Sequence, residues 1–174
     1  MKPIVLVISV MILHVSTVFS QLKQEGVLNG KYKTFQVDNG EVKYVKYNKK
    51  ETTLFIYNLD NSIWKTVKLP LPKGHLLDEV KLITIKTFNN DTLAEIVYSC
   101  VVYDYSLGND ADYSTKTSFT LNIINEKGDV LLKVPDSNNF EIVESNGTKK
   151  LFVYKHFGEG FNEQDQTIVY SLPN

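Results

Sequence analysis

Residues Ile56–Pro70, with the sequence IYNLDNSIWKTVKLP, decide the fold. Aromatic and β-branched residues flank a polar Asp-Asn-Ser turn, and a proline ends the run, which is the pattern of a β-hairpin. A shorter version returns at Ile123–Pro135 (IINEKGDVLLKVP), and a third begins at Ile168–Pro173 (IVYSLP). We therefore expect a chain built by repeating one hairpin unit.

A second hairpin precedes each of these stretches. Turn signals of Asn, Asp and Gly stand at residues 38–40, 89–91 and 145–147. Asn and Gly tolerate the positive φ angles that two-residue hairpin turns need. Each turn signal separates two runs with strand composition; the pairs are 32–37 and 42–47, 80–88 and 94–103, and 140–144 and 150–155.

The resulting prediction is an all-β domain, because no stretch keeps a helical period of hydrophobic residues. It contains three four-stranded, blade-like repeats in an antiparallel meander, either propeller-like or a partly closed sheet. A β-trefoil is the alternative, since it has a similar length and a three-fold repeat. The third repeat lacks its last strand, which leaves an exposed edge, and residues 21–29 could fill it.

Alternation along residues 63–69 predicts a half-buried strand in which Ile63, Lys65, Val67 and Leu69 share one face. Trp64 lies on the other face. It is then either a core residue between two packed sheets or an exposed platform, and its place in the hydrophobic pattern favours the core.

The first 20 residues differ from the rest of the chain. Lys2 is followed by an apolar run that ends near Phe19, and Ser20 precedes a cleavage point before Gln21. This pattern predicts a secretory signal peptide at 1–20 and a single domain at 21–174. The alternative is a membrane anchor, but His14 interrupts the run and no basic cluster follows it. We expect secretion to the cell surface or the periplasm, with no membrane span after cleavage.

Composition excludes several classes of function. The formal net charge is −1, and all 19 basic residues are lysines. A near-neutral chain without arginine or a basic cluster is a poor nucleic-acid binder. Cys100 is the single cysteine and lies in an apolar run, which favours a buried, inert thiol over a nucleophile and rules out an internal disulfide.

The segments IYNLDNSIWKT, NEKGDVLL, SNGTKKL and IVYSLP, in this order, resemble those of uncharacterised secreted β-repeat proteins of Bacteroidota. In that family the last segment commonly precedes a type IX secretion sorting domain. The resemblance covers about Lys43 to Pro173 and implies export and surface display, with no catalytic residues. The sequence departs from the pattern because no sorting domain follows Pro173.

Two long loops, at 103–115 and 156–166, are the predicted binding face, because equivalent loops of neighbouring repeats meet at one edge. Aromatic rings can stack on sugars there, and carboxylates can accept bonds from hydroxyl groups. The alternative is a solvated loop with structural tyrosines. The candidate ligand-binding residues are Tyr103, Tyr105, Asp110, Asp112, Tyr113, Phe157, Glu159 and Phe161.

A Ca²⁺ site is a further possibility, because Asn109, Asp110 and Asp112 cluster hard oxygen ligands, although their spacing is not that of an EF-hand. No other cofactor is expected.

We predict an exported, non-catalytic module that binds a glycan or a protein. A glycan-processing hydrolase that uses the loop carboxylates, or a purely structural scaffold, are the alternatives. Neither His75 nor His156 is accompanied by a nucleophile motif.

Overall fold

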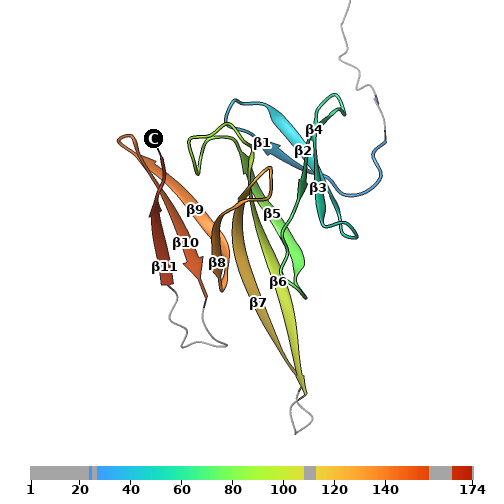
Figure 1. Ribbon diagram of the computed structural model, residues 1–174, viewed down its shortest axis with the longest axis vertical. Coiled ribbons are helices and arrows are strands. Elements are labelled where there is room, and N and C mark those ends of the chain that lie inside the picture. Colours follow the sequence, from blue (N-terminus) through green and yellow to red (C-terminus); the bar gives the residue numbers. More distant parts are fainter. Residues whose placement is uncertain (1–23, 25–26, 108–112, 157–165, 174) are drawn as a thin grey trace, which may run out of the picture.

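The computed structural model describes residues 24, 27–107, 113–156 and 166–173, and it leaves out the side chains of 104–107 and 113–116. This part of the chain forms eleven β-strands and no helix. The strands form three antiparallel sheets of four, four and three strands (Figure 1). The all-β prediction is confirmed. No sheet of the described residues closes on itself, so their strands do not form the barrel of a β-trefoil.

Each sheet is a meander whose strands follow the order of the chain. Sheet A consists of β1 (Lys33–Gln36), β2 (Val42–Asn48), β3 (Thr53–Asn58) and β4 (Ile63–Lys68). Sheet B consists of β5 (Leu76–Thr84), β6 (Glu95–Leu107), β7 (Tyr113–Asn125) and β8 (Val130–Pro135). Sheet C consists of β9 (Ser137–Ser145), β10 (Thr148–Lys155) and β11 (Gln166–Ser171).

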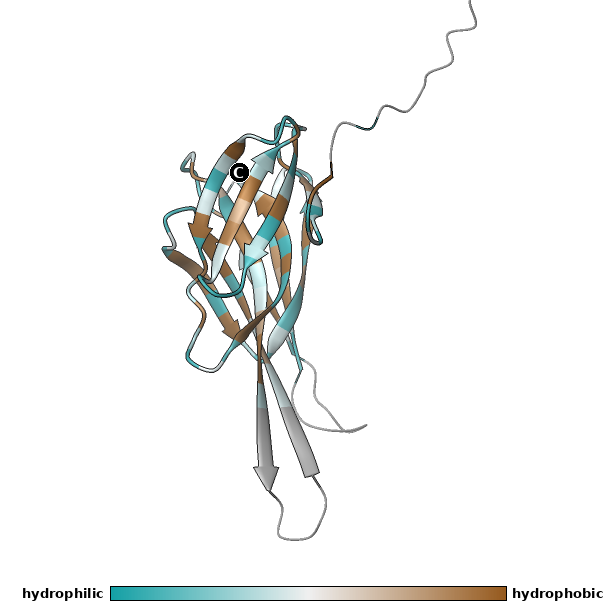
Figure 2. Ribbon diagram, turned by 90° about the vertical axis from the view of Figure 1, so that its right-hand side faces the viewer, coloured by the Kyte–Doolittle hydropathy of each residue, from teal (hydrophilic) through white to brown (hydrophobic). Residues whose placement is uncertain are grey.

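Sheet B lies between the other two sheets and is buried on both faces (Figure 1). On one face, Ile96 and Tyr98 pack with Leu54 and Ile56 of sheet A. On the opposite face, Val97 and Leu121 pack with Leu151 and Val153 of sheet C. Hydrophobic and hydrophilic residues alternate along the strands, as Figure 2 shows, because successive side chains point to opposite faces.

Two of the predicted turns are confirmed by their backbone angles. Asn146 and Gly147 both have positive φ angles, 51° and 72°, and they join Ser145 directly to Thr148. Gly40 also has a positive φ, 82°, in the turn between β1 and β2. These are the conformations that Asn and Gly adopt at the lowest cost.

The turn predicted at residues 89–91 is different from a tight hairpin. The expected strand 80–88 ends at Thr84, and residues 85–94 form a loop before β6. The buried carboxylate of Glu95 accepts hydrogen bonds from the backbone N–H groups of Thr87, Phe88 and Asn89, at 2.8–3.1 Å. Burial raises the pKa of Glu95, and these amides oppose the rise. The carboxylate thus stabilises a loop where alternation alone predicted a strand.

The predicted face of residues 63–69 is wrong at Ile63. Tyr57 pairs with Ile63 and Ile56 pairs with Lys65, so Trp64 is a β-bulge. The extra residue reverses the alternation, and Ile63 is 58% exposed while Val67 is fully buried. Trp64 is partly buried against the core shared by sheets A and B, which confirms its predicted packing role.

The described part of the N-terminal segment does not complete sheet C. Of residues 21–29, Gln24 and Val27–Asn29 are described; they are exposed and belong to no strand. The predicted signal peptide at 1–20 lies outside the described residues. In the part of the chain that is described, no helix has the length and hydropathy needed to cross a membrane.

Candidate functional site

The loop predicted at residues 103–115 is mostly strand. Strand β6 continues to Leu107 and β7 begins at Tyr113, and the two pair along their whole length. Of the predicted ligand-binding residues, Tyr103 is 46% exposed on β6. Tyr105 and Tyr113 belong to β6 and β7. The remaining candidates, Asn109, Asp110, Asp112, Phe157, Glu159 and Phe161, lie outside the described residues.

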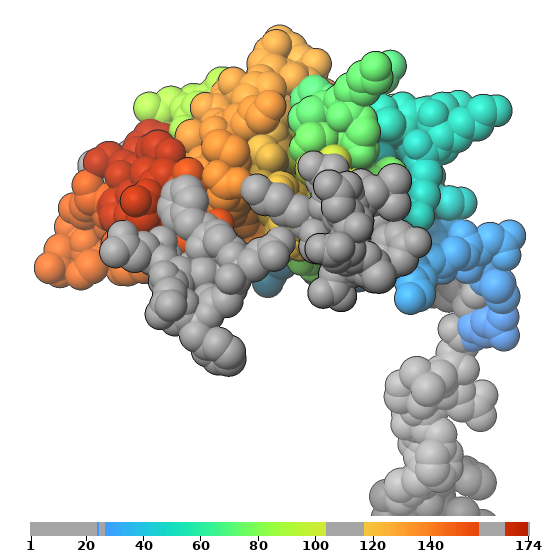
Figure 3. Space-filling view, turned by 90° about the horizontal axis from the view of Figure 1, so that it is seen from below, coloured from blue at the N-terminus to red at the C-terminus, as the bar shows by residue number. Residues whose placement is uncertain are grey.

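The described strands of the hairpins β2–β3, β6–β7 and β10–β11 run toward the same side of the molecule, which is the lower side in Figure 1 and faces the viewer in Figure 3. Lys49 of the β2–β3 turn and Tyr103 of β6 line the same pocket. At the end of β10, the His156 N–H donates to Asp136 O at 2.8 Å, and the Asp136 N–H donates to Phe119 O of β7 at 2.9 Å. The edge was expected to carry the binding face.

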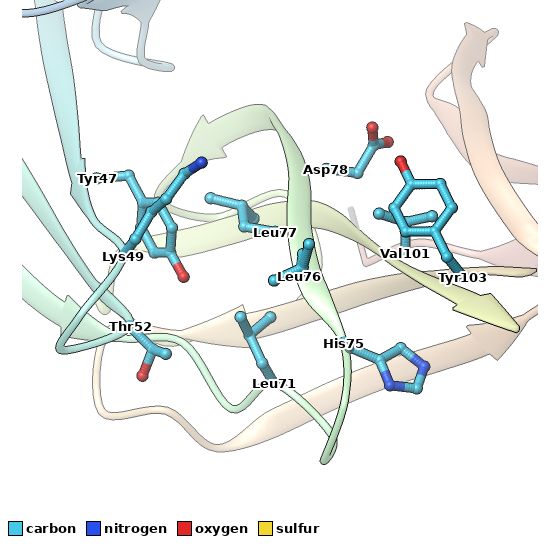
Figure 4. Close-up of a pocket in the computed structure, with 10 residues that line it drawn as sticks. All are labelled: Tyr47, Lys49, Thr52, Leu71, His75, Leu76, Leu77, Asp78, Val101 and Tyr103. Carbon is cyan, nitrogen blue, oxygen red and sulfur yellow. The ribbon is translucent and has the colours of Figure 1, made fainter. Parts of the chain in front are cut away.

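The pocket at this edge has a volume of about 330 Å³ and lies around strand β5. Figure 4 shows β5 passing between two groups of side chains, with Tyr47 and Lys49 on one side and Asp78 and Tyr103 on the other. Leucines of β5 and of the preceding loop form the apolar part of its wall. We call it the β5 pocket; it is lined by Tyr47, Lys49, Thr52, Leu71, His75, Leu76, Leu77, Asp78, Val101 and Tyr103.

A second hollow adjoins the β5 pocket, because both are lined by Tyr47 and Lys49. It lies over the ends of β2 and β3 and has a volume of about 400 Å³. No described carboxylate lines it; the nearest one in sequence, Glu51, accepts a bond from Asn48 Nδ2 at 3.1 Å. We call it the β2–β3 groove; it is lined by Lys46, Tyr47, Asn48, Lys49, Lys50, Phe55 and Tyr57.

A row of tyrosines extends the β2–β3 groove across the outer face of sheet A. Tyr57 and Tyr44 are paired in register and stack with their ring centroids 5.1 Å apart. Tyr32 meets Tyr44 edge to face at 5.4 Å, and Lys46 Nζ lies 5.9 Å from the Tyr32 ring centroid. Such aromatic pairs stabilise a fixed orientation of the rings. Tyr44 is only 7% exposed, so the accessible part of the row is formed by the half-buried rings of Tyr32 and Tyr57, beside Lys46.

The β2–β3 groove is cationic, whereas the β5 pocket contains the carboxylate of Asp78 as well as Lys49. Lys49 and Lys50 are exposed at the turn, and Lys46 is exposed on β2. Burial raises the pKa of Tyr47 above its usual range, so its hydroxyl stays protonated and can donate a hydrogen bond. Exposed ammonium groups beside aromatic rings suit an anionic ligand with apolar faces.

No group of three metal-ligating side chains occurs among the described residues. The Ca²⁺ ligands proposed from the sequence lie outside that part of the chain. His75 lines the β5 pocket, and its Nδ1 lies 3.3 Å from Lys73 O. Asp78, in the same pocket, accepts a hydrogen bond from the buried Ser99 hydroxyl at 2.6 Å.

Comparison with known proteins finds no matching family model, no matching curated protein and no matching solved structure.

Sequence reasoning missed the lysines and aromatic residues of the β2–β3 groove. The turn at 48–51 is short, and only the two long loops were predicted to bind a ligand. A usable signal is present in the sequence, since Lys46, Lys49 and Lys50 are close together and Phe55 and Tyr57 alternate in the strand that follows. The pairing of those strands then brings Lys46 opposite Phe55.

Proposed function

We propose that this chain is an exported, non-catalytic module that binds an acidic carbohydrate at the β2–β3 groove and the adjoining β5 pocket. The observation that carries the proposal is that Lys46, Lys49 and Lys50 meet Phe55 and Tyr57 in one hollow. An ammonium group pairs with a carboxylate or sulfate as a point charge and does not need the arginine fork. The aromatic rings offer faces for the C–H side of a sugar ring.

The dimensions of the site support the same proposal. Each hollow falls in the range of about 300–1,000 Å³ that small-ligand sites occupy. Together with the half-buried rings of Tyr32 and Tyr57, which contact the buried Tyr44, they offer an extended surface, which suits several sugar residues of one chain. Tyr103 and His75 would meet an uncharged part of the ligand in the β5 pocket, because the carboxylate of Asp78 there would repel an acidic group.

The proposal also includes export of the protein and a fold of three repeats. Export rests on the signal-peptide pattern at residues 1–20 and on the resemblance to secreted proteins of Bacteroidota. We take sheets A, B and C as three blade-like repeats, supported by their meander order and their face-to-face packing. A glycan on the cell surface or in the periplasm is then the ligand that the module meets.

Isothermal titration with polygalacturonate and with its methyl-esterified, uncharged form tests the proposal. We expect binding of the acidic polymer, at least tenfold weaker binding of the ester, and a dissociation constant that rises with salt. Lys49→Gln with Lys50→Gln weakens binding, and so does Tyr103→Ala. Lys127→Gln, on an exposed turn at the opposite edge, is the matched control.

Three outcomes would reject the proposal. Equal affinity for the charged and the esterified polymer would remove the role of the lysines. Failure of acidic polysaccharides of both the uronate and the sulfate class to bind would remove the carbohydrate itself. Binding of a single-stranded oligonucleotide in preference to either polymer would also contradict it, since stacked rings and lysines can serve nucleic acids as well.

A further inference from the structure

Strand β11 forms an open edge of sheet C. Among the described strands, sheets A and B have a fourth strand beyond the third, and sheet C does not. The inward side chains of the third strands in sheets A and B, such as Leu54 and Leu121, are fully buried. Ile168 and Tyr170 of β11 pack against the core shared by sheets B and C but are only half-buried. Figure 1 shows β11 at the side of the molecule, away from the other sheets.

The other edge strands carry features that prevent pairing with a further strand, and β11 carries none of them. Bulges, lysines, prolines and shortness are the usual protections of a β-sheet edge. The residues of β11 are QTIVYS, which are uncharged, and β11 pairs with β10 without a shift of register. The protections elsewhere are bulges in β4, β5, β8 and β9, and a length of four residues with Lys33 in β1.

The hydrogen bonds of the β10–β11 hairpin fix which backbone groups of β11 face outward. The Leu172 N–H donates to Lys149 O at 3.0 Å. Paired residues alternate between bonded and non-bonded positions in an antiparallel ladder. Leu172, Tyr170 and Ile168 therefore bond to β10. The backbone N–H and C=O groups of Thr167, Val169 and Ser171 point to the open edge.

We infer that β11 pairs antiparallel with β11 of a second copy of this chain, about a two-fold axis at Val169. Val169 then faces its own counterpart, and Thr167 of each copy faces Ser171 of the other. All three outward residues of each copy are used, which gives six backbone hydrogen bonds. The two copies of sheet C become one continuous six-stranded sheet.

The chemistry of the strand supports a second copy as the partner. A two-fold axis places like side chains together, and charged residues there would repel. Strand β11 has no charged residue from Gln166 to Ser171, so no like charges meet at the axis; the ammonium group of Lys150 lies 2.6 Å from Ser171 Oγ, two residues from Val169. Val169, which is 51% exposed, would pack on its counterpart. On the inner face, Ile168 would lie opposite Tyr170 of the second copy, which is a favourable β-branched and aromatic pair.

Sedimentation of the purified protein over a concentration series tests the inference, without any carbohydrate present. We expect a reversible shift from monomer to dimer. Val169→Lys places two positive charges at the axis and should give a monomer at every concentration. Val143→Lys is the matched control, because Val143 is exposed to 39% on β9 at the opposite edge of sheet C. It should dimerise as the parent does.

Cross-linking tests the register. Hydrogen-bonded pairs have Cα atoms about 5.5 Å apart, which a disulfide can bridge. Val169→Cys should form a covalent dimer on mild oxidation, and Val143→Cys should not. Cys100 is fully buried and does not compete. A parent protein that stays monomeric at all concentrations overturns the inference. A dimer that survives Val169→Lys, or that Val143→Cys cross-links equally well, also overturns it.

Because these measurements contain no glycan, failure of the dimer leaves the carbohydrate proposal standing, and the reverse also holds.

Discussion

Lys33 Nζ lies 2.6 Å from Glu79 Oε1, and this ion pair joins β1 of sheet A to β5 of sheet B. Lys33 Nζ also donates to Val80 O at 3.0 Å, and Lys81 Nζ donates to Glu79 Oε2 at 2.8 Å. The hydrogen bonds from Lys33 and Lys81 lower the pKa of Glu79 from 4.5 to about 2. The carboxylate therefore contributes to the contact between two sheets.

The first prediction concerns pH. The pKa of Glu79 is lower in the folded chain, so its contribution to stability is complete above about pH 4.5 and is lost as pH falls toward 2. Both side chains are 48% exposed, which limits the contribution to about 0.2–1 kcal/mol. Urea titrations should show that Glu79→Gln lowers the free energy of unfolding at pH 7 but has a smaller effect at pH 3.

Glu144→Gln, on β9, is the control for this comparison, because its carboxylate has only a longer contact of 3.5 Å to Lys149 within the same sheet; it should show a smaller change with pH. An effect of Glu79→Gln that is as large at pH 3 as at pH 7 would contradict the ion-pair assignment.

The second prediction concerns the buried carboxylate of Glu95. It accepts hydrogen bonds from three consecutive backbone N–H groups, at Thr87, Phe88 and Asn89. Glutamine keeps the size but replaces one acceptor oxygen by an amide that faces donors. Because bonds to charged groups are worth about 1.5–3 kcal/mol, Glu95→Gln should reduce the free energy of unfolding by about 3 kcal/mol. A loss below about 0.5 kcal/mol by urea titration would contradict this role.

Local sequence signals predicted the meander because they act between neighbours. The Asn146-Gly147 turn and the alternation in β3 depend on residues that are adjacent in sequence or in a hairpin. The loop after β5 could not be predicted in that way. Asp38 Oδ2 accepts from the N–H groups of Ile85 and Lys86, at 2.9 and 3.1 Å, from 47 and 48 residues away. A turn signal at residue 38 does not reveal that contact.

Sequence reasoning named Tyr103 of the candidate site but not its lysines. The loop edge was expected from the repeat, and Tyr103 does line a pocket there. The cationic side of the site depends on Lys49, which comes near β5 through the packing of sheet A on sheet B. No spacing in the sequence encodes that approach.

The third prediction tests the bulge at Trp64. Ile63 is 58% exposed and Val67 is fully buried, although strict alternation would place both on one face. Ile63→Lys should change the free energy of unfolding by less than about 0.5 kcal/mol, as exposed positions do. Val67→Lys would bury an unpaired charge and should cost more than about 4 kcal/mol. Thermal unfolding of both variants provides the measurement, and similar losses for the two would show that the bulge is absent.

The fourth prediction concerns Cys100, which is fully buried and accepts a contact from Asn122 Nδ2 at 3.5 Å. Burial raises the pKa of its thiol, so the reactive thiolate is scarce as well as shielded. A thiol reagent should label the folded protein at least about a thousandfold more slowly than the protein in urea, because labelling requires opening. Rapid labelling of the native chain, with unchanged circular dichroism, would show that sheet B opens locally at β6 or that its packing on sheet A is different from the one described.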